Sequence, residues 1–427
     1  CLMDRLKTFI GSNRFHVFLA CLVLILSVIL RFYEFAKPLD TQEWLQISWE
    51  DSGRDYIVAN HIVTYGEFPM NGPAGHLGST WVSPLYFYFI STPLLIYNDI
   101  RFLHFFNVFL QIGALFGVYT LARTLFGKGA GLIALTLFGL SSGLIWQSSF
   151  IWQPHAMHPF IILSYLLLAL GYKRKSKSLL IWSTVVFWVS MTFHYSVLAM
   201  VPAYLILVIL AFRSMQAKTK DYILLGITSL VTLVLLYAPT VVFVSNTTSA
   251  SKEFSFMLLN ATATEKSISV IADNLTDRVL TLFDFFLDND ETSLRSVFPR
   301  RLIYTGMVIV STAIMVYFLK RKKDEKYYFM LVTIFAVCSF LLIAAIRGFP
   351  YGSFDVRHLT PIMSLSIIIL SELVYRIGGR SMLTSITRAG VILGLIYLLL
   401  FNNTDWKIHS ITPVREIVAK ASSIFVP

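Results

Sequence analysis

Long apolar runs recur along this chain, and they constrain its fold more than any other feature. Eleven runs are long enough to cross a bilayer as helices, which takes roughly 17 to 25 residues each. They begin near Phe15, Phe102, Gly129, Ala156, Ser178, Ser196, Tyr222, Arg301, Tyr327, His358 and Arg388. Over the whole chain 56% of residues are hydrophobic and only 14% are charged, which excludes a water-soluble domain of this size. We therefore expect an all-α polytopic membrane protein with about eleven transmembrane helices, in which residues 1–427 form a single membrane domain.

One further apolar stretch, Pro84–Tyr97, decides which loops share a side of the membrane. It is shorter than the others, contains Pro93 and is rich in tyrosine. If it lies at the surface as a juxtamembrane helix and the amino terminus is cytoplasmic, every strongly basic loop falls on the cytoplasmic side, as Lys and Arg do in membrane proteins. These loops are Cys1–Arg14, Arg123–Lys128, Lys173–Lys177, Arg213–Asp221, Lys320–Lys326 and Arg376–Arg388. The net charge of +11 is thus a topology signal, and we expect no nucleic-acid partner.

The same orientation predicts that the polar segments gather on the extracytoplasmic face. They are the first outer loop, residues 34–101, with its juxtamembrane helices, and a long loop over 245–300 that contains an amphipathic stretch. The turn Trp146–Pro159, the turn Arg347–Arg357 and the end of the run that reaches His194 share this side. Chemistry, if the chain performs any, is expected there.

The first outer loop contains a charged cluster at helical spacing. Asp51, Arg54 and Asp55 stand at positions i, i+3 and i+4, so a helix would place an acid, a base and a second acid on one face. Ser48 and Asp51 resemble a capping box, and Gly66 supplies a stop. We expect a short amphipathic helix over residues 49–65.

Cofactor and disulfide signals are weak. Three cysteines form no C-x-x-C motif, and no disulfide framework is available. His155, His158 and His194 have no spacing to acidic residues that would indicate a preformed metal site. We assign no metal ligand, and we leave a dependence on a divalent metal ion open.

Four segments, taken in order, resemble a known family. They are DSGRDY at Asp51 followed by GEFPMNGP and SPLYFY, FIWQPHAMHP at residues 150–159, MTFHYS at 191–196, and DVRHLTPIM at 355–363. Together they resemble the C-type (GT-C) membrane glycosyltransferases, in particular bacterial relatives of the dolichyl-phosphate-mannose protein O-mannosyltransferases and the lipid A aminoarabinose transferase. Gln153 stands in place of the usual Asn, His358 in place of Tyr, and Ser52 in place of a second acid. The similarity runs from Phe15 to about Tyr397.

The resemblance implies an inverting glycosyltransferase of the cell envelope, held in the inner membrane by its multi-pass domain. It would move a single sugar from a polyprenyl-phosphate donor to a hydroxyl of an acceptor glycan, lipid or protein on the extracytoplasmic face. The chain shows no large carboxy-terminal domain of the oligosaccharyltransferase kind, which favours a single sugar. Asp51 matches the catalytic acid of the family and would act as the base. Residues expected to bind donor or acceptor are Arg54, Asp55, Tyr56, Tyr86, Trp152, His155, His194, Tyr195, Arg357 and His358.

Other interpretations stay open. A lipid-linked sugar transporter or flippase would use ionisable residues at mid-membrane and paired broken helices. A catalytically inactive membrane scaffold would keep the fold without depending on Asp51. Individual residues also have structural alternatives: Asp51 as a helix cap, Arg357 as a headgroup anchor, and Tyr86 and Trp152 as parts of an interfacial aromatic belt. The sugar, the acceptor and the oligomeric state are not encoded in any pattern we find.

Overall fold

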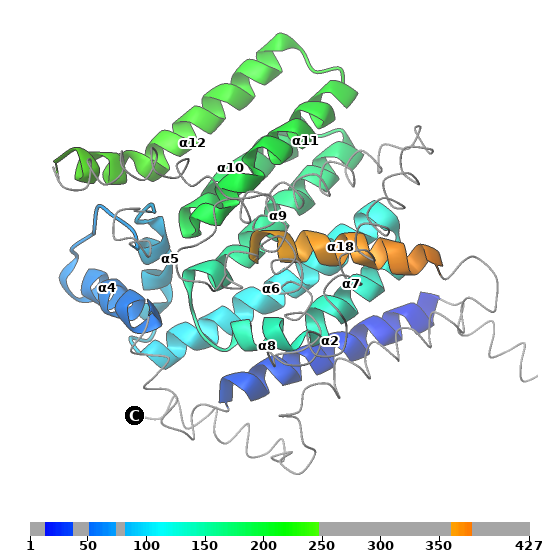
Figure 1. The fold of residues 1–427 in the computed structure, drawn as a ribbon, viewed down its shortest axis with the longest axis horizontal. Coiled ribbons are helices and arrows are strands. Elements are labelled where there is room, and N and C mark those ends of the chain that lie inside the picture. The colour runs from blue at the N-terminus through cyan, green and yellow to red at the C-terminus, as the bar shows by residue number, and fades with distance from the viewer. Residues whose placement is uncertain (1–12, 37–50, 74–81, 247–359, 378–427) are drawn as a thin grey trace, which may run out of the picture.

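A computed structural model describes residues 13–36, 51–73, 82–246 and 360–377 (Figure 1). Within these ranges the chain is helical and contains no β-strand. The helices are α2 (Asn13–Ala36), α4 (Asp51–Tyr65), α5 (Leu85–Leu94), α6 (Ile100–Phe126), α7 (Lys128–Leu140), α8 (Ser142–Ser148), α9 (Gln153–Arg174), α10 (Lys177–Phe193), the 3-10 helix Tyr195–Met200, α11 (Val201–Ser214), α12 (Thr219–Asn246) and α18 (Thr360–Ile377). The expected all-α architecture holds for this part of the chain.

Four of the described helices, α2, α6, α9 and α12, are long and apolar enough to cross a membrane. The apolar runs at α7, α10, α11 and α18 also form helices, but these are shorter. The runs that begin near Arg301, Tyr327 and Arg388 lie outside the described residues, as does the loop expected over 245–300 apart from residues 245 and 246, which belong to α12. A multi-pass membrane protein is supported, and the count of eleven spans stays a prediction.

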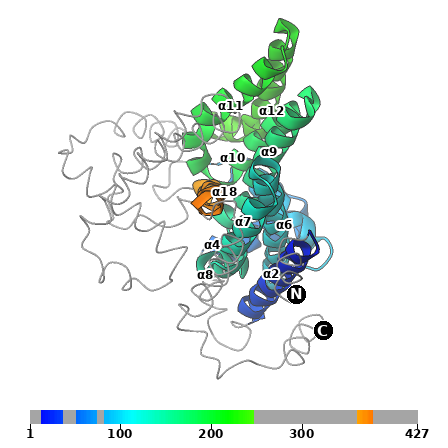
Figure 2. The same cartoon turned by 90° about the vertical axis from the view of Figure 1, so that its right-hand side faces the viewer.

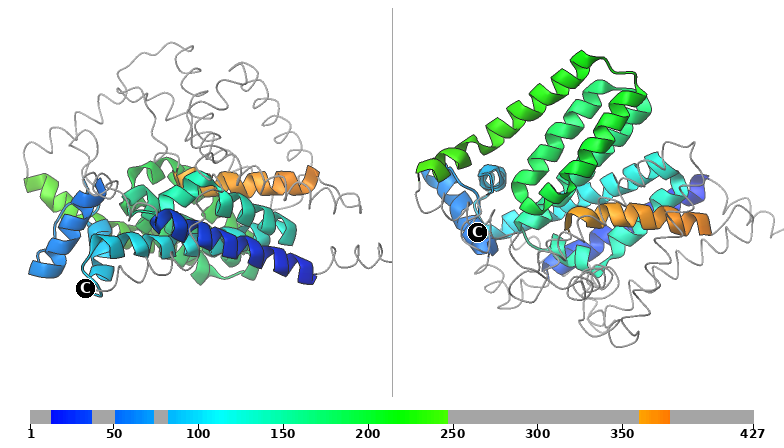
Figure 3. Two further views of the ribbon diagram at one scale, coloured as in Figure 1. Left: turned by 90° about the horizontal axis from the view of Figure 1, so that it is seen from below. Right: turned by 45° about the horizontal axis from the view of Figure 1, so that its top comes forward.

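The helices form two groups joined by α9 (Figures 1 and 2). On one side α6 packs against α7, and α2 packs against α6, α7 and α8. On the other side α10 packs against α9, α11 and α12, which run beside one another (Figure 3). Helix α18 lies across α7 and α9. The connections α6–α7, α9–α10 and α11–α12, which carry predicted cytoplasmic basic loops, lie at the opposite end from α4 and α5 (Figure 1).

Helix α4 confirms the helix expected over 49–65, apart from its first two residues, which are not described. Helix α5 has 10 residues and is therefore about 15 Å long, half of what a bilayer core requires. This length agrees with a juxtamembrane helix. Just before α5, the Ser83 hydroxyl donates to the Leu236 carbonyl of α12 at 2.5 Å, which ties the first outer loop to the bundle.

The run from Gly129 is interrupted, contrary to the expectation of one span. Helix α7 ends at Leu140 after 13 residues, about 20 Å, and Ser141 is extended before α8 begins. Buried Arg31 of α2 explains the break, because it donates from Nη1 to the Gly139 carbonyl at 2.8 Å and from Nη2 to the Phe138 carbonyl at 3.2 Å. The Arg31 guanidinium thus donates to carbonyls that would have no partner within the helix at its C-terminal end.

Candidate functional site

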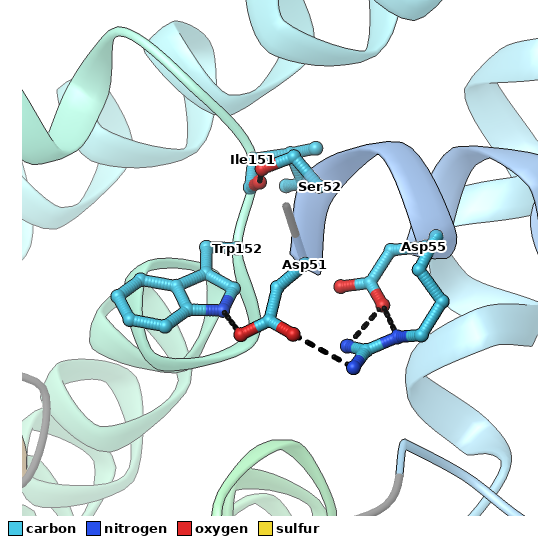
Figure 4. A network of polar contacts seen from close by, with 6 residues as sticks. Asp51, Ser52, Asp55, Ile151 and Trp152 are labelled. Atoms are coloured by element: carbon cyan, nitrogen blue, oxygen red, sulfur yellow. Dashed lines mark hydrogen bonds and ion pairs between the residues drawn. The ribbon is translucent and has the colours of Figure 1, made fainter. Parts of the chain in front are cut away.

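The charged cluster of α4 is assembled as its spacing predicts, and Asp51 lies at its centre (Figure 4). One carboxylate oxygen, Oδ1, accepts from Arg54 Nη1 at 2.7 Å, and the other, Oδ2, accepts from the Trp152 indole Nε1 at 3.0 Å. Asp51 is the first residue of α4 and its side chain is 38% exposed. The positive end of the helix and two N–H donors stabilise the carboxylate charge, while solvent still reaches it.

Arg54 joins the two acids of the cluster. Besides its bond to Asp51, it donates from Nε at 3.0 Å and from Nη2 at 2.6 Å to Asp55 Oδ1. Partial burial alone would lower the pKa of Arg54, but the carboxylates of Asp55 and Asp51 raise it above the ordinary value. The guanidinium is therefore held in the charged state, and 38% of the side chain stays exposed.

Asp55 differs from Asp51 in its surroundings. Its side chain is fully buried, and burial raises its pKa to about 6, although the Arg54 guanidinium acts in the opposite direction. Oδ2 and the buried Tyr86 hydroxyl of α5 each lack a hydrogen-bond partner among the described residues, yet each affects the other's pKa. The two groups are thus close neighbours. Asp55 anchors Arg54 and does not face solvent.

The α8–α9 turn, residues 149–152, brings Trp152 to Asp51. The Ser52 hydroxyl donates to the Ile151 carbonyl at 2.6 Å, so the first turn of α4 is bonded to this turn at two adjacent positions (Figure 4). An ionised carboxylate in place of Ser52 would have no proton to donate, so this bond requires a side chain with a donor such as the serine hydroxyl. Glu50, the acid that directly precedes Asp51 in the sequence, lies outside the described residues.

Three polar residues of α6 belong to the same arrangement, and our sequence analysis did not identify them. His104, Asn107 and Gln111 are fully or almost fully buried, and all three hydrogen-bond the backbone between Gln147 and His155. Their spacing of i, i+3 and i+7 on an otherwise apolar spanning helix was the available signal, because polar side chains inside a membrane need partners.

The other predicted residues lie at varying distances from this cluster. The His155 ring is buried and nearly perpendicular to the Trp152 ring, with the ring centroids 5.3 Å apart. Tyr56 reaches Asn98 rather than the acids, with a 3.5 Å contact from its hydroxyl. His194 ends α10 beside Phe193, whose ring packs edge-on against Tyr86. Tyr195 begins the 3-10 helix that follows. Arg357 and His358 lie outside the described residues.

The described residues do not offer a metal site. They contain no group of three or more His, Cys, Asp or Glu side chains placed to hold a metal ion. At the α4 cluster, both oxygens of Asp51 and Oδ1 of Asp55 already accept from cationic or N–H donors, and the Arg54 guanidinium would repel a cation. A role for a divalent ion stays untested for the rest of the chain.

Comparison with known proteins gives matches only among solved structures. No family model and no curated protein sequence matches the chain. The apo form of the oligosaccharyltransferase of Archaeoglobus fulgidus is similar over 92% of this chain and 55% of that one, with 15% identity and a TM-score of 0.48. The same protein tethered to an acceptor peptide gives 14% identity over 92% and 55%, with a TM-score of 0.45. The chain spans about half the length of that enzyme. These TM-scores lie below 0.5, so the likeness does not establish a shared fold.

Proposed function

We propose that this protein is an inverting membrane glycosyltransferase that moves a single sugar from a polyprenyl-phosphate donor to an acceptor hydroxyl on the extracytoplasmic face. The observation that carries the proposal is Asp51, a half-exposed carboxylate at the start of α4 that is held by Arg54 and Trp152. The resemblance of the four sequence segments to the C-type glycosyltransferases supports it, because Asp51 is the residue that matches the catalytic acid of that family.

Asp51 is suited to act as the base. Arg54 and Trp152 each bond a different oxygen of the carboxylate, and 38% of the side chain is exposed. An acceptor hydroxyl can therefore approach Asp51 from the solvent side. In the proposed step the hydroxyl oxygen forms a bond to the anomeric carbon, its proton passes to Asp51, and the bond from the anomeric carbon to the phosphate oxygen breaks on the opposite side. The product then has the inverted configuration.

Arg54 is suited to receive the leaving phosphate. A guanidinium has five N–H donors, and Nε and one hydrogen on each terminal nitrogen are engaged by Asp51 and Asp55. The other two N–H groups have no acceptor among the described residues, and they can meet an anion on the exposed side of the residue. A phosphate is a weak base and needs no general acid, but its growing charge is stabilised by such cationic donors near a low-dielectric surface. The two hydrogen bonds to Asp55 would hold the Arg54 guanidinium in this orientation.

The experiment that tests the proposal measures sugar transfer in proteoliposomes. A panel of radiolabelled polyprenyl-phosphate sugars is supplied with host membrane extract as the source of acceptor. We expect transfer from one donor class, and a fall of about a hundredfold to ten-thousandfold in the Asp51→Asn variant with donor binding retained. The control is Asp99→Asn, which changes an acid that caps α6 near α4 and pairs with Arg101.

Two results would overturn the proposal. Transfer by Asp51→Asn at the wild-type rate would show that Asp51 is not the base. A complete lack of transfer from every donor, together with movement of a fluorescent lipid-linked sugar between leaflets, would instead identify a transporter. Transfer only from a lipid-linked oligosaccharide would keep the glycosyltransferase assignment and replace the single-sugar donor.

A further inference from the structure

Ile151 is held from two sides by helices that are far apart in the sequence. Its backbone N–H donates to Nδ1 of His104 on α6 at 3.0 Å, and its carbonyl accepts from the Ser52 hydroxyl on α4 at 2.6 Å. His104 Nδ1 is therefore the unprotonated ring nitrogen. One residue of the α8–α9 turn thus joins the bundle to the first turn of α4.

Asn107 fixes the backbone immediately before Ile151. Its Nδ2 lies 3.0 Å from the Gln147 carbonyl, 3.2 Å from the Ser148 carbonyl and 2.8 Å from the Phe150 carbonyl. The carbonyls of Gln147 and Ser148 are at the end of α8, where a helix leaves them without partners. Since Asn107 is fully buried, water does not compete for these bonds. The amide therefore sets the path of the turn.

The position of Trp152 depends on that path. Trp152 follows Ile151 directly, and its indole N–H is the donor to Asp51 Oδ2. The ring is also stacked on Phe150, with ring centroids 6.5 Å apart, so the indole orientation is fixed relative to the turn that Asn107 bonds. A shift of the turn would move the donor away from the carboxylate.

We infer that Asn107 is a positioning residue for Asp51, which acts through the α8–α9 turn and the indole N–H of Trp152. This inference rests on the proposed function for its catalytic meaning. The coupling of α6 to the indole can be measured without any activity, so failure of the inference and failure of the proposed function are distinguishable.

The experiment follows the indole N–H resonances of the full-length protein, labelled with ¹⁵N-tryptophan in detergent micelles. The chain has 8 tryptophans, and the signal missing from Trp152→Phe identifies Trp152. An Asp51→Ala variant gives the position of that signal when its acceptor is absent. We expect Asn107→Leu to move the Trp152 resonance toward this reference position. Ser183→Ala, which removes a buried hydroxyl on α10, should leave the resonance unchanged.

Ser52→Ala tests the same coupling from the α4 side and is the decisive variant if Asn107→Leu does not fold. It removes only the bond to the Ile151 carbonyl and should displace the Trp152 resonance in the same direction. In a transfer assay we expect kcat to fall about tenfold to a hundredfold in Asn107→Leu, with the donor KM little changed, because the base is misplaced and donor contacts are not. An unchanged Trp152 resonance in the folded variants would overturn the inference, whatever the transfer rates are.

Discussion

Two arginines in this protein, Arg54 and Arg31, show how differently the same side chain is used. Arg54 on α4 bonds two carboxylates, has two N–H donors without an acceptor in the described part of the chain and is 38% exposed. Arg31 on α2 is fully buried, and its described hydrogen bonds all go to backbone carbonyls of α2 and α7. The first arrangement leaves donors for an anion, whereas the second uses them to end a helix. Exposure and the charge of the partners, more than residue type, separate a binding site from a structural contact.

Among the substitutions considered, Arg31→Met should have the largest effect, which is a loss of folding stability. Without the guanidinium the carbonyls of Phe138 and Gly139 are buried with no donor from α2, and each such loss costs about 1–3 kcal/mol, so we expect about 4 kcal/mol less stability. Unfolding in mixed detergent micelles measures this. Arg14→Met, at the exposed start of the same helix, is the control and should change little. Equal losses in both variants would contradict the structural role of Arg31.

Asp55→Asn should be more stable than the wild type at neutral pH, and this advantage should grow as pH rises from about 4 to 7. Burial raises the folded-state pKa of Asp55 to about 6, above the unfolded value of about 3.9, so its stabilising contribution is present below about pH 4 and is lost as pH rises to about 6. The variant is neutral throughout and avoids this loss. We expect it to gain on the wild type by up to about 3 kcal/mol between pH 4 and pH 7, measured as the free energy of unfolding in micelles.

Asp99→Asn is the matched control for this pH dependence, with the opposite sign. Burial alone would raise the pKa of Asp99, but hydrogen bonds from Arg101 lower it below the ordinary value. Its contribution is therefore present at neutral pH and is lost as pH falls through the folded-state pKa. The variant should be less stable than the wild type at pH 7, and the difference should shrink on acidification. The same sign of pH dependence in both variants would contradict the contrast between the two carboxylates.

Arg54→Lys should reduce transfer with little change in stability. A single ammonium cannot bond both carboxylates and also present a planar fork to a phosphate. We expect about a thirtyfold lower kcat/KM for the donor, which corresponds to about 2 kcal/mol. Arg123→Lys, at the far end of α6 from α4, is the control. If Arg54→Lys instead destabilises the protein as much as Arg31→Met should, the two arginines have the same role and the comparison fails.

Gly139→Ala should give the smallest effect, at the contact that Arg31 secures. A Cβ atom there would lie 2.2 Å from the Ser27 hydroxyl oxygen, which is itself fixed by a bond to the Val23 carbonyl at 2.6 Å. We expect about 1–2 kcal/mol less stability from this overpacking. Gly113→Ala, where a Cβ would meet nothing within 4 Å, is the control and should be neutral or slightly stabilising in the same unfolding measurement.

The sequence was sufficient for features that depend on neighbours along the chain. Helical periodicity placed Asp51, Arg54 and Asp55 on one face of α4, and the ion pairs among them follow from that spacing. The length of the Pro84–Tyr97 stretch indicated a helix too short to span, as α5 is. Apolar runs predicted the described long helices, because burial in lipid requires them.

Only the tertiary structure decided which acid is exposed and what holds it. Helical spacing places Asp51 and Asp55 on the same face of α4 and does not say which of them is buried. The packing of α4 against α5 buries Asp55 beside Tyr86 and leaves Asp51 half-exposed. The bond from Trp152 to Asp51 joins residues 101 positions apart, and the interruption of α7 depends on Arg31, 108 positions before Gly139. Local periodicity reports which face a residue occupies, but burial and long-range hydrogen bonds depend on what packs against that face, and this arises only when the helices assemble.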